Sequence, residues 1–389
     1  MHSLAMASFM KNKTKNILII AGEASGDLHG ASLVRAIKQL RPEFHFWGIG
    51  GDRMAEAGVE LFYHIRDLAF IGFFEWIRHF PFIRRVFYEM LRQVKIQKPD
   101  LAILIDYPGF NLRMAKAIKS HATPVIYYIG PQIWAWGKNR IKTMKRCIDR
   151  ILVIFDFEEA IYKKENMDVV FVGHPLKDVV KVLMSKETFF KGIKLDPARP
   201  LLALFPGSRP QEIRYLLPDM LKAVDLVRQE IPSLQCAIGL APTLSDEVYW
   251  PYLKKAKELH VLRGYTYELM AYSTVAVVAS GTATLETAIL GTPMVILYRM
   301  APLSFWIGKR VVQTSHIGLV NILGGRTVVP ELLQNEVTSE NIRNAVLPFL
   351  KDEAYRNSVS QALQEIVNRL GPPGASERAA KHIVEFIEK

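Results

Sequence analysis

The stretch Thr274-Val-Ala-Val-Val-Ala-Ser-Gly-Thr-Ala-Thr-Leu-Glu286 decides the fold class, because it joins a buried strand to a helix through small residues. The apolar run before Ser280 predicts a strand that is covered on both faces. Backbone N–H groups at the start of the following helix can point at an anion, and the helix dipole assists them. An ordinary turn capped by serine or threonine is the alternative interpretation.

A second turn of similar chemistry, Phe205-Pro-Gly-Ser-Arg209, follows the apolar run 201–205. Two phosphate-friendly turns in one half of a chain predict a nucleoside diphosphate site. The predicted contacts are Gly207, Ser208 and Arg209 from this turn, and Ser280, Gly281, Thr282 and Ala283 from the other. Glu286 lies about one helical turn further along, where its carboxylate can accept hydrogen bonds from ribose hydroxyls.

The composition bounds the class of protein. The 389 residues suit two domains, and half of them are apolar. We find no window apolar enough to span a membrane and no secretory signal in residues 1–15, which read as a loose leader. The two cysteines, Cys147 and Cys236, have no metal-ligand spacing, so we expect neither a disulfide framework nor a metal site.

The net charge of +12 favours contact with an anionic surface, either nucleic acid or phospholipid. The densest basic run is 138–150. A solvated helix face explains such a run equally well. A nucleic-acid binder would also need a reading helix or exposed aromatic platforms, and we identify neither, so we expect no nucleic-acid partner.

Apolar runs alternate with longer periodic stretches along the chain, which predicts parallel strands with crossover helices. The fold class is therefore α/β, with two Rossmann-like doubly wound parallel-sheet domains facing a cleft. We expect domains at 16–178 and 179–345, followed by a helical tail at 346–389. The predicted strands are 16–21, 44–49, 101–105, 124–129, 150–155 and 169–172, then 201–205, 235–240, 260–262, 274–279 and 293–298.

Three turns of the first half carry candidate site residues. Glu23, Ser25 and Asp27 follow the first strand, where carboxylates suit sugar hydroxyls better than phosphate. Asp106 directly follows the strand 101–105, the position at which catalytic side chains gather, although a lone aspartate often only caps a turn. Trp134, in the turn after 124–129, can stack on a sugar or fill a domain edge.

The segment 68–91 is dense in aromatic residues and punctuated by arginines. A pair of core helices with solvated arginines is one interpretation. An interfacial membrane contact or a groove for a lipid chain is the other, with rings in the acyl boundary and guanidinium groups on phosphates. Candidate lipid contacts are Phe73, Trp76, Arg78, Phe80, Arg84 and Arg85.

The motifs GEASGD (22–27), IDYPGFN (105–111), PQIWAW (131–136), FVGHPL (171–176), PGSR (206–209), ASGTATLE (279–286) and LVN (319–321) occur in this order. Together they resemble the lipid A disaccharide synthase family from residue 16 to the C-terminus. Gly109 stands where many members carry a second aspartate, which leaves the role of Asp106 untouched.

The resemblance implies an inverting, metal-independent glycosyltransferase of the GT-B type that needs no cofactor. It implies that UDP-2,3-diacylglucosamine and 2,3-diacylglucosamine 1-phosphate are joined into a β-1,6-linked disaccharide 1-phosphate with release of UDP. It also implies a peripheral position, with anionic lipid as a partner, on the cytoplasmic face of the inner membrane of Gram-negative bacteria. The oligomeric state, including a homodimer, is left open.

Within that resemblance, Asp106 is the expected general base and Arg209 neutralises the leaving UDP. Asn321 matches a position that the family needs for activity. A UDP-GlcNAc 2-epimerase-like isomerase on the same fold is the rival function, and the aromatic segment 68–91 counts against it, since an epimerase has no use for it.

Overall fold

The computed structural model describes residues 14–68, 73–131, 133–134, 140–254, 256, 258–300 and 316–389, and of residues 68 and 73–80 only the backbone. The chain divides into two compact units. The first contains the residues up to Pro175 together with Pro373–Lys389, and the second is Leu176–Pro372.

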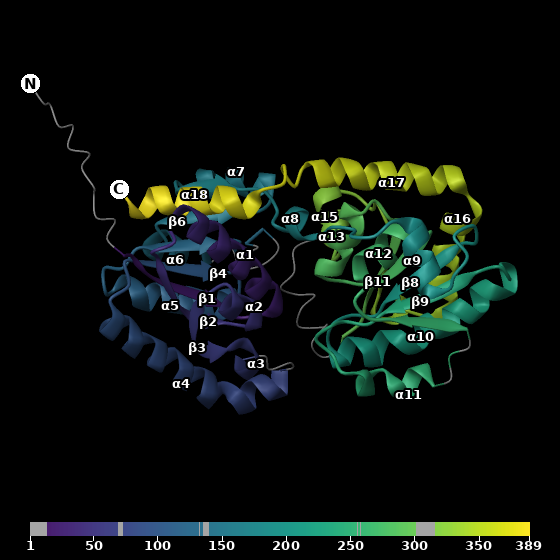
Figure 1. Ribbon diagram of the computed structural model, residues 1–389, viewed down its shortest axis with the longest axis horizontal. Coiled ribbons are helices and arrows are strands. Elements are labelled where there is room, and N and C mark those ends of the chain that lie inside the picture. Colours follow the sequence, from purple (N-terminus) through teal and green to yellow (C-terminus); the bar gives the residue numbers. More distant parts are fainter. Residues whose placement is uncertain are drawn as a thin grey trace, which may run out of the picture. The chain divides into compact units, whose positions relative to one another are not determined.

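The first unit is built on a parallel sheet with the strand order β3-β2-β1-β4-β5-β6-β7 (Figure 1). Its strands are β1 (Asn16–Ala21), β2 (His45–Gly50), β3 (Val59–His64), β4 (Leu101–Ile105), β5 (Val125–Tyr128), β6 (Arg150–Val153) and β7 (Val169–Phe171). Its helices are α1 (Ala24–Leu40), α2 (Asp52–Glu56), α3 (Ile65–Leu68), α4 (Phe73–Gln97), α5 (Pro108–Lys119), α6 (Arg140–Cys147), α7 (Asp156–Lys164) and α18 (Ala375–Ile387).

The second unit is built on a parallel sheet with the order β10-β9-β8-β11-β12-β13. Its strands are β8 (Leu201–Phe205), β9 (Gln235–Gly239), β10 (Leu259–Leu262), β11 (Val275–Ala279), β12 (Met294–Tyr298) and β13 (Glu331–Leu333). Its helices are α8 (Leu176–Val179), α9 (Lys186–Ile193), α10 (Pro210–Glu230), η1 (Asp246–Val248), α11 (Trp250–Leu253), α12 (Thr266–Tyr272), α13 (Thr282–Ile289), α15 (Leu319–Gly324), η2 (Gln334–Glu336), α16 (Ser339–Lys351) and α17 (Glu353–Asn368).

These two parallel sheets confirm the predicted fold class. The central strands are buried on both faces, as their unbroken apolar runs require: every residue of β4 and of β11 is buried. The prediction missed two strands, β3 and β13, which lie at sheet edges. Both are only partly buried over most of their length and therefore lack the apolar run that marks a central strand.

Each sheet reverses its strand order once, between β1 and β4 in the first unit and between β8 and β11 in the second. At such a switch point the loops after two neighbouring strands diverge to opposite faces, and ligands bind outside the carboxyl ends of the strands. The four strand ends concerned are followed by GEASGD, which runs into α1, by the Asp106 turn, by PGSR and by the Ser280 turn. The topology thus places the chief sequence motifs at the two positions where this fold binds ligands.

The C-terminal helices are shared between the units. Helix α16 packs on α10 and α17 packs on α13 within the second unit, whereas α18 lies along α1 in the first (Figure 1). Arg41 forms an ion pair of 2.5 Å with Glu388 beyond the end of α18. The last part of the stretch 346–389, from Pro373 onward, belongs to the first unit, because the apolar face of α18 is buried there.

Helix α4 runs unbroken through Pro81, so the segment from Phe73 onward is one helix and not the pair of helices that the core interpretation supposed. In its described part, Val86 and Met90 are fully buried, while Phe82 packs partly against the core of the first unit. Arg84 and Arg85 are exposed, and the Arg84 guanidinium lies 5.7 Å from the ring centroid of Tyr88. The core interpretation therefore holds for the second half of α4.

The side chains of Phe73, Trp76, Arg78 and Phe80 lie outside the described residues. In the part of the chain that the structure describes, no helix combines the length and apolar character needed to cross a bilayer.

Candidate functional site

Asp106 lies at the carboxyl end of β4, at the switch point of the first sheet. It and Tyr107 both adopt left-handed backbone conformations, with φ of 44° and 48°. Such conformations cost free energy in non-glycine residues and persist only where the surroundings hold them. The Asp106 side chain is partly exposed, so it is not sealed inside the unit.

Two buried side chains hold this turn through the main chain of Asp106. The hydroxyl of Tyr127 donates to the Asp106 carbonyl at 2.5 Å, and the Asn111 amide donates to the same carbonyl at 2.8 Å and to that of Ile105 at 3.0 Å. Because these bonds use backbone carbonyls, they leave the Asp106 carboxylate free of side-chain donors among the described residues, and it accepts one backbone hydrogen bond, from Tyr107.

The surroundings make the Asp106 carboxyl more basic than usual. Burial raises its pKa from 3.8 to about 6, and the negative charge of Glu23 adds to this rise, while a hydrogen bond from the Tyr107 backbone opposes it. Near neutral pH the group is thus mostly ionised but basic enough to accept a proton. A general base requires that combination.

The two carboxylates that follow β1, those of Glu23 and Asp27, differ in exposure. Glu23 is exposed and Ser25 is partly buried. Asp27 is buried and accepts hydrogen bonds from the backbone N–H groups of Gly51 (2.7 Å), Arg53 (3.2 Å) and Met54 (3.0 Å). Both oxygens of Asp27 thus cap the start of α2, which is a structural task.

Trp134 is tied to a carboxylate that no sequence motif marked. Its indole N–H donates to Oε1 of Glu158 at 3.0 Å, and Oε2 of Glu158 accepts from the Phe155 backbone at 3.2 Å. Burial raises the pKa of Glu158 from 4.5 to about 7, opposed by these hydrogen bonds and increased slightly by the charge of Asp106. The only sequence signal was its place shortly after β6, since its partner lies 24 residues away.

The PGSR turn after β8 is held by Glu212. Oε2 of Glu212 accepts from the backbone N–H groups of Ser208 (2.9 Å) and Arg209 (3.3 Å), and Oε1 lies 3.6 Å from the Arg209 guanidinium. Gly207 has φ of 115°, and a Cβ there would fall 2.2 Å from Oε2 of Glu212. Glycine is therefore needed for the approach of this carboxylate, and the exposed Arg209 side chain is the cationic group that the turn offers.

The Ser280 turn after β11 is open. Gly281 and Thr282 are exposed, Ser280 and Ala283 are partly buried, and a Cβ on Gly281 would meet nothing within 4 Å. Glu286, one turn into α13, accepts a hydrogen bond from the Tyr267 hydroxyl at 3.1 Å, and burial raises the pKa of its carboxyl. The Ser280 amide, predicted as an anion donor, instead donates to the Leu297 carbonyl at 2.8 Å, so the predicted amide donors that remain are those of Gly281, Thr282 and Ala283.

Asn321 is fully buried and its amide is engaged on both sides. Its oxygen accepts from the backbone N–H groups of Val328 (2.7 Å) and Val329 (3.0 Å). Its nitrogen donates to the Val329 carbonyl at 2.8 Å and to Glu331 at 2.7 Å. These bonds join α15 to the loop before β13, so Asn321 acts on the architecture of the second unit and has no free group for a substrate.

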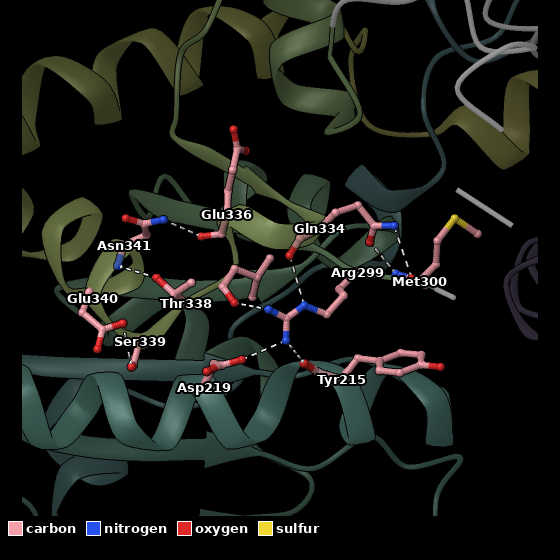
Figure 2. Close-up of polar contacts among 11 residues, drawn as sticks. Tyr215, Asp219, Arg299, Met300, Gln334, Glu336, Thr338, Ser339, Glu340 and Asn341 are labelled. Atoms are coloured by element: carbon pink, nitrogen blue, oxygen red, sulfur yellow. Dashed lines mark hydrogen bonds and ion pairs between the residues drawn. The ribbon is translucent and has the colours of Figure 1, made fainter. Parts of the chain in front are cut away.

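Arg299 fixes the carboxyl end of β12 (Figure 2). Its guanidinium donates to the Asp219 carboxylate at 2.8 Å and to the Tyr215 carbonyl at 3.0 Å, both on α10, and to the Gln334 carbonyl at 3.1 Å. The Gln334 side chain pairs in turn with both backbone groups of Met300. The strand end is thereby tied to α10 and η2, on the side of the second unit that carries the PGSR turn.

The basic run 138–150 is at least partly neutralised. In its described part, Lys145 pairs with Glu165 at 2.9 Å and Arg150 pairs with Asp168 at 2.8 Å. This supports the interpretation of the run as a solvated helix face.

Solved structures of similar fold define the class of protein. The UDP-GlcNAc 2-epimerase of Neisseria meningitidis, solved with UDP-GlcNAc, has a TM-score of 0.62 at 12% identity and covers 95% of this chain and 100% of its own. The calicheamicin glycosyltransferase has a TM-score of 0.59 at 15% identity, covering 97% and 99%. At these identities the likeness shows the fold alone, which is the GT-B fold of two parallel-sheet domains.

Sequence similarity then identifies the family. Residues 17–385 match the lipid-A-disaccharide synthetase family. The lipid-A-disaccharide synthases of Trichlorobacter lovleyi and Syntrophus aciditrophicus are 42% and 43% identical over 378 residues, which is 97% of this chain and 99% of each relative. The chain belongs to the lipid-A-disaccharide synthase family and is a glycosyltransferase, while the epimerases are neighbours in fold only.

Proposed function

We propose that this enzyme transfers the sugar of UDP-2,3-diacylglucosamine to the 6-hydroxyl of 2,3-diacylglucosamine 1-phosphate, releasing UDP and forming the β-1,6-linked disaccharide 1-phosphate with inversion. The observation that carries the proposal is the partly exposed Asp106 carboxyl, with a pKa of about 6, at the switch point of the first sheet. A base of this strength can deprotonate an acceptor hydroxyl as the glycosidic bond forms.

The second unit binds the donor in this proposal. The amides of Gly281, Thr282 and Ala283 hold the diphosphate at the start of α13, because the helix dipole and the accessible N–H groups favour an anion there. Ser280, whose amide donates to the Leu297 carbonyl, contributes its hydroxyl instead. Glu286 accepts hydrogen bonds from the ribose hydroxyls.

The PGSR turn supplies the remaining charge on the donor side. Arg209 stabilises the negative charge that develops on the departing UDP, a task that needs no metal ion. Gly207 and Ser208 shape the turn that presents Arg209, and Asn321 maintains the fold of this unit through its buried hydrogen bonds.

The first unit binds the acceptor in this proposal. Glu23, at the N-terminal cap of α1, and Ser25, in the first turn of that helix, follow β1, which neighbours β4 in the sheet, and can hydrogen-bond the hydroxyls of the acceptor sugar. Trp134 offers an aromatic surface to the same sugar. The expected acceptor role of Asp27 finds less support, because the cap of α2 occupies its carboxylate.

In this proposal the aromatic segment 68–91 contacts the acyl chains of the lipid substrates. Phe73, Trp76 and Phe80, with Arg78 nearby, contact lipid, while Arg84 and Arg85 are exposed and available for phosphate groups. The enzyme then works peripherally on the cytoplasmic face of the inner membrane, and its net charge of +12 suits anionic lipid there.

The test is an assay with both lipid substrates that follows UDP release and disaccharide formation together. Equal amounts of the two products, and no disaccharide when either substrate is omitted, support the proposal. Release of UDP without disaccharide, or conversion of UDP-GlcNAc into its 2-epimer, would contradict it.

A further inference from the structure

Three neighbouring strands of the first sheet each deliver one chemically distinctive side chain at their carboxyl ends. Asp106 follows β4, Trp134 lies in the loop after β5, and Glu158 lies in the first turn of α7 after β6. Adjacent strands are about 4.8 Å apart, so these three loops begin within roughly 10 Å of one another. The two side chains beyond Asp106 are joined by the hydrogen bond between the indole and the carboxylate.

Glu158 has more contacts than a helix cap requires. Only Oε2 is used in the capping bond to the Phe155 backbone, at 3.2 Å. Oε1 accepts the Trp134 N–H at 3.0 Å, and the whole side chain is only 1% exposed. A capping glutamate can fulfil its task at the surface, where its charge stays solvated. Besides the backbone groups of Phe155 and Ile154, the buried carboxylate therefore serves one described side-chain partner, Trp134.

Trp134 is covered only in part. Its ring forms a T-shaped contact with Phe157, at a centroid distance of 5.2 Å and an interplanar angle of 78°, and the residue retains exposed surface. A tryptophan whose N–H is held and whose ring also contacts another aromatic ring presents its remaining exposed surface in a defined orientation. An aromatic ring of this kind can stack on the apolar face of a pyranose.

We propose that Glu158 is a positioning residue for the acceptor: it holds the Trp134 indole in the orientation that receives the acceptor sugar beside Asp106. This inference rests on the proposed function. Glu158 acts through Trp134, while Trp134 contacts the sugar and Asp106 carries out the proton transfer.

The test compares steady-state kinetics of full-length variants with short-chain analogues of the two lipid substrates. Trp134→Phe keeps a ring and loses the N–H, and Glu158→Ala loses the acceptor. Both should raise the KM for the acceptor roughly tenfold, the effect of one lost hydrogen bond to a charged group, and leave the KM for the UDP-sugar within about twofold. The double variant should be no worse than the more impaired single variant, because both changes break the same bond.

Conservative variants separate positioning from folding. Glu158→Gln keeps an amide oxygen for the indole and should restore much of the acceptor KM relative to Glu158→Ala. Glu159→Gln, on the same helix and paired with Lys163 at 3.0 Å, is the matched control and should change neither KM. Trp134→Phe leaves the α7 cap intact, so it remains informative if Glu158→Ala does not fold.

The outcomes distinguish this inference from the proposed function. If the native chain forms disaccharide but Trp134→Phe keeps a native acceptor KM, or if the two single effects add fully, the positioning role is refuted. If Glu158→Ala merely lowers the melting temperature at native KM values, Glu158 is only a cap. If the native chain forms no disaccharide at all, the proposed function itself fails.

Discussion

The Asp106→Asn variant should be slower than the native enzyme by roughly 100-fold or more, the usual contribution of a general base, and yet more stable at neutral pH. Asparagine has nearly the same shape and can still accept the hydrogen bond from the Tyr107 backbone. The bonds from Tyr127 and Asn111 reach the backbone carbonyl of residue 106 and are unaffected. The substitution therefore removes the basicity and the charge with little other disturbance.

The gain in stability follows from the raised pKa. Moving the pKa from 3.8 to about 6 means that ionising Asp106 in the folded protein costs about 3 kcal/mol, at about 1.4 kcal/mol per pKa unit. Solvent at the partly exposed carboxylate screens part of this cost, so we expect asparagine to stabilise the first unit by about 1–3 kcal/mol. That corresponds to a rise in melting temperature of roughly 2–12 °C for a unit of this size.

The stability gain of Asp106→Asn over the native chain should increase with pH. A carboxyl whose folded pKa is raised costs no folding free energy below pH 3.8, where it is protonated in both states. The cost grows as the pH rises towards 6 and is complete above it. The stability difference between Asp106→Asn and the native chain should therefore be about a fifth of its full value at pH 4 and reach its full value above pH 7.

Calorimetry across this pH range measures the stability difference, and pH–rate profiles of kcat/KM measure the pKa of the base. The native enzyme should lose activity as the pH falls through about 6, and Asp106→Asn should lack that limb. Glu23→Gln should move the limb to lower pH, because the Glu23 charge contributes to the raised pKa. The exposed Asp67→Asn is the control and should change stability by less than about 0.5 kcal/mol. Near-native turnover in Asp106→Asn would remove Asp106 from the mechanism, and a stability gain as large at pH 4 as at pH 7 would refute the burial argument.

Three further variants test other parts of the structure. Arg209→Ala should lower kcat/KM roughly 10- to 100-fold, because the diphosphate loses the guanidinium that neutralises it. An unchanged rate with unchanged UDP affinity would exclude that role. Asp27→Asn should destabilise the first unit by about 1–3 kcal/mol, because an amide cannot satisfy all three capped N–H groups; urea unfolding at a native midpoint would contradict this. Replacing Phe73, Trp76 and Phe80 together by serine should release the enzyme from vesicles of anionic lipid with its circular dichroism unchanged; a misfolded product would favour a core role instead.

Much of the fold was predictable because central parallel strands are a local property of the sequence. A strand buried on both faces must be apolar throughout, so runs such as 101–105 and 201–205 identify themselves. Polar or glycine-rich residues directly after such a run must lie at the carboxyl edge of the sheet. For that reason the order of residues along the chain suffices to mark Asp106, Arg209 and the Ser280 turn as candidates.

Only the tertiary structure decided which distant residues each site residue contacts. Glu158 meets Trp134 because β5 and β6 are neighbours in the sheet, and Asp27 caps α2 because β1 and β2 are neighbours. Asn321 resembled a site residue in the sequence. Its burial among backbone groups depends on the loop before β13, which folds back onto α15 in the tertiary structure. The edge strands β3 and β13 escaped prediction for the same reason: one-sided burial is set by the neighbouring strand. The sequence by itself specifies which segments must be buried, because their apolar runs cannot face water. Strand order and the folding back of loops determine which distant residues pack against or bond to them.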